Sequence, residues 1–137
     1  MLRTAISNIA WGNLEDGPFL RLAASLGAYG IECAPSVIWE DPVDTSSRER
    51  YLFRAKVEGF DLKVVSLHAL LFNRPDLKIF GSPQLRGQTA DYLVGLGKLA
   101  RDLDARLMVL GSPKNRAIGT MNREEADRLA TGFFRNV

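Results

Sequence analysis

The stretch LKVVSLHALLF, residues 62–72, shows most plainly how this chain folds. It is a run of apolar and β-branched residues that is interrupted by Ser66 and by His68, the one histidine of the sequence. A near-continuous apolar run is typical of a strand in a parallel sheet that is covered on both faces. Similar runs occupy residues 3–11 (RTAISNIAW), 29–35 (YGIECAP) and 105–113 (ARLMVLGSP). We therefore predict four strands.

Segments with helical spacing separate these runs. Helices are predicted within residues 17–27, 44–59 and 82–105, and from Asn122, with Glu125 completing a capping box, to Phe134. Leu22, Ala23 and Leu26 are predicted to lie along one side of the first helix, and the third helix is predicted to have a buried stripe. This stripe is predicted to contain Tyr92, Leu93, Leu96, Leu99, Ala100 and Leu103. Alternating strands and helices predict an α/β fold with a parallel sheet and right-handed crossovers.

The composition limits the class of protein. The 137 residues suit a single domain, taken as residues 1–137, and 46% apolar with 25% charged residues is typical of a globular protein. The net charge of +2 is dispersed along the chain and gives no nucleic-acid footprint. With one cysteine there is no internal disulfide, and no apolar run approaches the length of a membrane span. We expect a cytoplasmic protein that binds neither nucleic acid nor membrane.

Four βα units also bound the architecture. A complete (β/α)8 barrel takes about 250 residues, so four units correspond to half of one. Four parallel strands also suit a small open sheet, and periodicity alone does not choose between the two.

Four sequence blocks resemble a known family. ISNIAW (6–11), GIECAP (30–35), SLHALLF (66–72) and LGSPKNR (110–116) are similar, in order, to blocks of the xylose-isomerase-like barrels, in their sugar phosphate isomerase/epimerase branch. The resemblance implies the first half of a (β/α)8 barrel, with the active site at the carboxyl ends of the strands. It also implies a divalent metal (Mn, Mg, Zn or Co) that assists proton transfer next to the carbonyl of a sugar or sugar phosphate.

The chain departs from the family pattern in its second half. The family's metal-binding Glu, Asp, His and Glu belong to later strands, which this sequence does not contain, so we assign no metal ligand and no catalytic residue. We expect the chain alone to be inactive. Its expected partner is either a missing C-terminal half-barrel or a second copy, since a half-barrel has two open sheet edges. The alternative is a non-catalytic half-barrel binding module that self-associates through these edges.

Substrate-facing residues are expected where the four blocks end. The candidates are Trp11, Glu32, His68, Ser112, Lys114, Asn115 and Arg116. A carboxylate in an apolar strand such as Glu32 must reach the barrel mouth or a partner. The sequence leaves open whether His68 is a substrate contact, a hydrogen-bonded core residue or a metal ligand, and whether residues 112–116 bind a ligand or form a solvated loop. Trp11 stacks on a sugar or packs the barrel mouth, and Cys33 is read as a small core residue.

Overall fold

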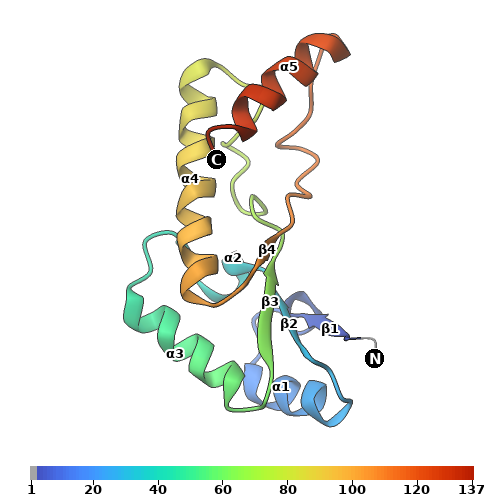
Figure 1. The fold of residues 1–137 in the computed structure, drawn as a ribbon, viewed down its shortest axis with the longest axis vertical. Coiled ribbons are helices and arrows are strands. Elements are labelled where there is room, and N and C mark those ends of the chain that lie inside the picture. Colours follow the sequence, from blue (N-terminus) through green and yellow to red (C-terminus); the bar gives the residue numbers. More distant parts are fainter. Residues whose placement is uncertain (1–2) are drawn as a thin grey trace.

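A parallel sheet of four strands runs through the middle of the computed structural model, which describes residues 3–137 (Figure 1). The sheet order follows the sequence, β1-β2-β3-β4, and every neighbouring pair is parallel. The strands are β1 (Ala5–Ser7), β2 (Gly30–Cys33), β3 (Lys63–Leu67) and β4 (Leu107–Met108). The predicted α/β fold is confirmed. The first two residues of the predicted domain lie outside the described residues.

Helices connect each strand to the next. They are α1 (Asp16–Ser25), α2 (Pro35–Ile38), α3 (Ser47–Glu58), α4 (Pro83–Asp102) and α5 (Arg123–Phe134), and a 3-10 turn, η1 (Asn8–Ala10), follows β1. In Figure 1, α3 and α4 lie along the left side of the sheet, whereas α5 lies beyond its upper end. The strands are shorter than their apolar runs, so His68 lies one residue after β3.

Local capping interactions set where several helices begin. The Ser46 side chain accepts a hydrogen bond from the Glu49 N–H, and the Glu49 side chain accepts one from the Ser46 N–H, which is a complete capping box at α3. At α5 the Asn122 side chain accepts a hydrogen bond from the Glu125 N–H at 2.9 Å. Within residues 3–137, the Glu125 side chain does not return a hydrogen bond to the Asn122 N–H. The predicted capping box is therefore incomplete, and Asn122 is a simple N-cap.

The core lies between the sheet and its helices. Ile31, Cys33 and Leu67 are fully buried on one face of the sheet, and all six predicted residues of the α4 stripe are buried. Of the three residues predicted to share one side of α1, Ala23 is buried, whereas Leu22 and Leu26 are 54% and 70% exposed. Leu20, about one turn before Ala23, is also buried. The apolar residues of this short helix lie on more than one side, so spacing alone did not fix its buried face.

An ion pair joins helices α3 and α4. Arg50 of α3 is 9% exposed and donates to Asp102 at the end of α4 at 2.9 Å, and it also donates to the Val43 carbonyl. The hydrogen bond from Arg50 lowers the pKa of Asp102 most strongly, and Arg101 adds to that shift against the opposing effect of desolvation. The pair therefore stabilises the fold only while Asp102 is ionised.

We expect this contribution to stability to disappear in acid. Because the folded-state pKa of Asp102 lies below its unfolded value of about 3.9, the stabilisation is present above that value and is lost as the pH falls through the folded pKa. Urea unfolding should show Asp102→Asn less stable than the natural chain at neutral pH, with the difference shrinking below about pH 4. Asp91→Asn, an exposed change on the same helix, is the control. A difference that stays constant down to the acid range would contradict the ion pair.

Candidate functional site at the carboxyl ends of the strands

Four polar side chains at the ends of the first three strands form two hydrogen-bonded pairs on one face of the sheet. The strand register aligns Ser7 with Glu32 and Glu32 with Ser66, and aligned residues of neighbouring strands point to the same face. The Ser66 hydroxyl donates to Glu32 Oε1 at 3.1 Å, and His68 Nε2 lies 2.8 Å from Ser7 Oγ. We call Ser7, Glu32, Ser66 and His68 the polar row. It lies on the sheet face opposite to Ile31 and Leu67.

Backbone contacts hold the histidine in place. The His68 N–H donates to the Cys33 carbonyl at 2.9 Å, which continues the pairing of β2 and β3 beyond the strand end. The chain then turns at Ala69, whose φ of 51° lies in the left-handed region that residues with a Cβ seldom adopt. On the other side, Ser7 Oγ also accepts the N–H of Ile9 at the start of η1. Strain and hydrogen bonds together fix the imidazole at the end of β3.

The face that carries the polar row is only partly covered. Ser66 is buried at 2% exposure, whereas Glu32 and His68 are half-buried. Leu107, in register with Ser66, is 65% exposed, and Val109, two residues further along the same face, is 50% exposed. Carboxylate, imidazole and hydroxyl groups are therefore accessible beside an apolar patch, an arrangement suited to hydroxyl-rich ligands with apolar ring faces.

Asn115, in the loop after β4, joins two loops of the fold. Asn115 is buried at 5% exposure, and its amide donates to the carbonyls of Arg74 and Leu77 at 2.7 and 2.9 Å. Both of its donor hydrogens therefore serve the loop after β3. Ser112 Oγ accepts the Leu71 N–H at 3.3 Å, which joins the same two loops.

The two cations of that loop are exposed, and they are not placed against the polar row. Lys114 offers its backbone carbonyl to the Lys78 ammonium at 3.1 Å, and Arg116 Nε donates to the carbonyl of Gly111. Of the predicted substrate-facing residues, the structure thus joins Glu32 and His68 in one row, and it assigns Ser112 and Asn115 to loop–loop contacts.

Trp11 is packed into the fold. Its side chain is 6% exposed, its ring stacks on Phe19 with centroids 5.5 Å apart, and its indole N–H donates to Asp16 at 2.9 Å. The sequence left open whether Trp11 stacks on a sugar or packs at the barrel mouth, and these contacts are those of a packed side chain. The residues that sequence reasoning missed are Ser7 and Ser66. Ser66 precedes His68 by two positions in one strand, so strand alternation could have indicated it.

Cys33 belongs to the core, and its thiol should not react in the folded chain. The side chain has 0% exposure; burial, with a smaller effect of the Asp16 charge, raises the pKa of the thiol. Because the thiolate is the reactive form, we expect no labelling by a thiol reagent under native conditions and one equivalent of labelling in denaturant. Fast labelling of the folded chain would show that this part of the sheet opens.

The donor groups present do not complete a zinc site by themselves. No cluster of three or more His, Cys, Asp or Glu side chains occurs among the described residues. A catalytic zinc ion is held by three protein ligands, and the polar row offers one carboxylate and one imidazole. Also within residues 3–137, no helix is long and apolar enough to cross a membrane.

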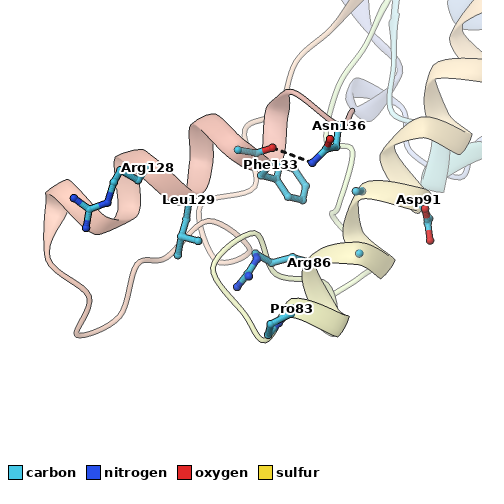
Figure 2. A pocket seen from close by; sticks show the side chains of 10 residues that line it. Pro83, Arg86, Asp91, Arg128, Leu129, Phe133 and Asn136 are labelled. Carbon is cyan, nitrogen blue, oxygen red and sulfur yellow. Dashed lines mark hydrogen bonds between the residues drawn. The ribbon is translucent and has the colours of Figure 1, made fainter.

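A separate hollow of about 530 Å³ lies between α4 and α5 (Figure 2), and no residue of the polar row lines it. Its walls include Arg86, Arg128 and Phe133 and none of the predicted site residues. In Figure 2 the Asn136 side chain donates to the Gly132 carbonyl at its rim, at 3.1 Å. This hollow therefore has no part in the candidate site.

A parallel sheet in sequence order, helical crossovers and polar side chains at the carboxyl ends of the strands define half of a (β/α)8 barrel. The comparison with solved structures agrees. The crystal structure of an AP endonuclease, family 2, from Brucella melitensis matches this chain with a TM-score of 0.60 at 18% sequence identity, over 99% of this chain and 49% of that one. The chain thus spans about half the length of that protein, and its fold is that of half of a (β/α)8 barrel. No protein-family model and no curated protein matches the sequence.

Proposed function

We propose that the chain supplies the substrate-binding wall of a sugar or sugar phosphate isomerase or epimerase. The observation that carries the proposal is the polar row, in which the pairs Ser7–His68 and Glu32–Ser66 hydrogen-bond side by side at the carboxyl ends of barrel strands. Hydroxyl, carboxylate and imidazole groups together can both donate to and accept from neighbouring sugar hydroxyls. The apolar Leu107 and Val109 beside them suit the C–H face of a sugar ring.

The reaction itself needs groups that this half does not provide. A divalent metal would polarise the carbonyl and hydroxyl oxygens of the substrate, and a carboxylate would move the proton between the adjacent carbons. The residues of this chain bind and orient the substrate. The metal ligands and the proton-transferring carboxylate belong, on this proposal, to a complementary half-barrel, and the chain alone is inactive.

The name of the solved neighbour suggests another substrate, abasic DNA. At 18% identity that likeness extends to the fold and not to the reaction. The cationic residues are dispersed along the sequence, none of them belongs to the polar row, and the chain has one histidine. A sugar substrate fits the polar row better than a phosphodiester backbone, which is recognised largely through clustered Lys and Arg side chains.

The test uses neutral sugars, so that no phosphate group contributes to binding. Aldoses and ketoses are titrated into the 137-residue chain with divalent metal present, and the backbone amides are followed by NMR. We expect amide shifts at Ser7, Glu32, Ser66 and His68, and no exchange of the sugar proton next to the carbonyl with solvent deuterium. Glu32→Gln and His68→Ala should abolish these shifts, and Glu40→Gln, in an exposed loop, should leave them intact.

Two results would overturn the proposal. One is an absence of shifts in the polar row with every sugar tested. The other is metal-dependent deuterium exchange catalysed by the isolated chain, because it would show that the complementary half is not needed.

A second candidate is a non-catalytic binding module that self-associates through its open sheet edges. The exposure of Leu107 and Val109 on the inner sheet face favours it, since an uncovered apolar patch marks an interaction surface. Sedimentation of the purified chain separates the two. A stable homodimer in which Leu107→Ser and Val109→Ser cause dissociation supports the module, and a monomer that binds sugar supports the enzyme half.

A further inference from the structure

A second hollow lies at the opposite end of the sheet from the polar row. It has a volume of about 530 Å³, and it is lined by residues of β3 and β4 and by residues that precede β1, β2 and β4. Arg3 precedes β1, Tyr29 precedes β2, Lys63 opens β3, and Arg106 precedes β4. A charged or aromatic side chain thus stands at the amino end of each strand, and three of the four are cations.

These three cations lack acidic partners. Among residues 3–137, none of Arg3, Lys63 and Arg106 forms an ion pair or a side-chain hydrogen bond. The one carboxylate that lines the hollow is Asp104, which is 58% exposed and lies 3.9 Å from the guanidinium of Arg54. The hollow therefore has an excess of positive charge. Among the other Lys and Arg residues of the described chain, seven pair with a carboxylate and eight do not, so what distinguishes this hollow is that three unpaired cations line it together.

The tyrosine ring holds two of the cations close together. The Arg3 guanidinium carbon lies 4.6 Å from the centroid of the Tyr29 ring, and the Lys63 ammonium lies 5.7 Å from the same centroid. The two positive groups are therefore no more than about 10 Å apart. A neutral ring positions both cations without cancelling their charge, so both stay available to a ligand.

We infer that this hollow binds a small multivalent oxyanion, of the polyphosphate or polycarboxylate class. Such a ligand carries charged oxygens on two ends of a short frame, so it can meet Arg3 and Lys63 together while Arg106 closes the third side. Arginine supplies paired N–H donors to phosphate or carboxylate oxygens, and lysine supplies a point charge. Leu107, which lines this hollow, also belongs to the apolar patch beside the polar row, so the two proposed sites adjoin at β4 and differ in the polar side chains that meet the ligand.

Titration of pyrophosphate into the 137-residue chain, followed by calorimetry and by amide NMR, tests the inference. We expect saturable binding of one equivalent, with shifts at residues 3, 29, 63 and 106 and none in the polar row. The triple variant Arg3→Gln, Lys63→Gln, Arg106→Gln should weaken binding about tenfold or more, because it removes the three charges that face the ligand. Raising the salt from about 20 mM to about 200 mM should weaken it as well, since these groups are exposed.

The matched control removes the same number of charges elsewhere. Arg48→Gln, Lys98→Gln and Arg135→Gln are exposed changes outside the hollow, and this variant should bind pyrophosphate as the natural chain does. An equal loss of binding in the two triple variants would overturn the inference, because it would reduce the effect to net charge. Absence of saturable binding to the natural chain at low salt would also overturn it. Neither result bears on neutral sugars at the polar row.

Discussion

Replacement of Gly30 by alanine is expected to unfold much of the sheet. Gly30 is buried and paired with Lys63, and a Cβ built on it would lie 2.2 Å from the Lys63 carbonyl oxygen and 2.8 Å from Val65 Cγ1. The first of these contacts is with backbone, which cannot move aside without breaking the pairing of β2 and β3. We expect a loss of about 3 kcal/mol or more, a large part of the stability of a small domain.

The measurement for Gly30→Ala is the urea midpoint, followed by circular dichroism. Gly97→Ala is the matched control, because a Cβ at Gly97 meets nothing within 4 Å and the residue lies inside α4. Alanine there should stabilise the chain by up to about 1 kcal/mol, since glycine is a poor helix former. A Gly30→Ala protein as stable as the natural chain would show that β2 and β3 do not approach as closely as described.

Replacement of Asn8 by alanine should have the second largest effect. Asn8 is 1% exposed, and its side chain spans the first two strand ends: Oδ1 accepts the Ala34 N–H at 2.7 Å and Nδ2 donates to the Ala34 carbonyl at 3.3 Å. Alanine would leave the buried Ala34 N–H without a partner, whereas the Ala34 carbonyl would keep the hydrogen bond that it accepts from the Val37 N–H at 3.1 Å. The expected cost is about 1–3 kcal/mol.

The same unfolding assay checks Asn8→Ala. Asn136→Ala serves as its control, because Asn136 is exposed and makes one hydrogen bond within the last helical turn, so its loss should change stability by less than about 0.5 kcal/mol. Should the two variants prove equally stable, Asn8 would not be the link between β1 and β2. The turn that presents Ser7 to His68 would then need another support.

Much of the fold could be predicted from the sequence. The stripe from Tyr92 to Leu103 spans about three helical turns, so its period alone indicated the buried face of α4. Helix α1 has ten residues with apolar side chains on several sides, and there the period did not indicate which face is buried. Helix α2 is a single turn after Pro35, too short to leave a periodic pattern.

The candidate site could be predicted only in part. The polar residues at the strand ends were visible one at a time, as Glu32 and His68 inside apolar runs. Their partners were not, because the hydrogen bond between Ser7 and His68 joins residues 61 positions apart and depends on strand register. Register follows from packing, and a shift of one residue would turn every side chain of a strand to the other face. In the same way, the two backbone carbonyls that occupy the Asn115 amide are set by loop packing and not by local sequence.

Sequencing of the coding region beyond codon 137 asks most directly whether this half-barrel is the substrate-binding part of a larger enzyme. The proposal predicts an in-frame continuation that brings the protein to about 250 residues, the size of a complete barrel, with acidic residues and histidine at the ends of its later strands. A stop codon directly after codon 137, or a continuation without those residues, would contradict it.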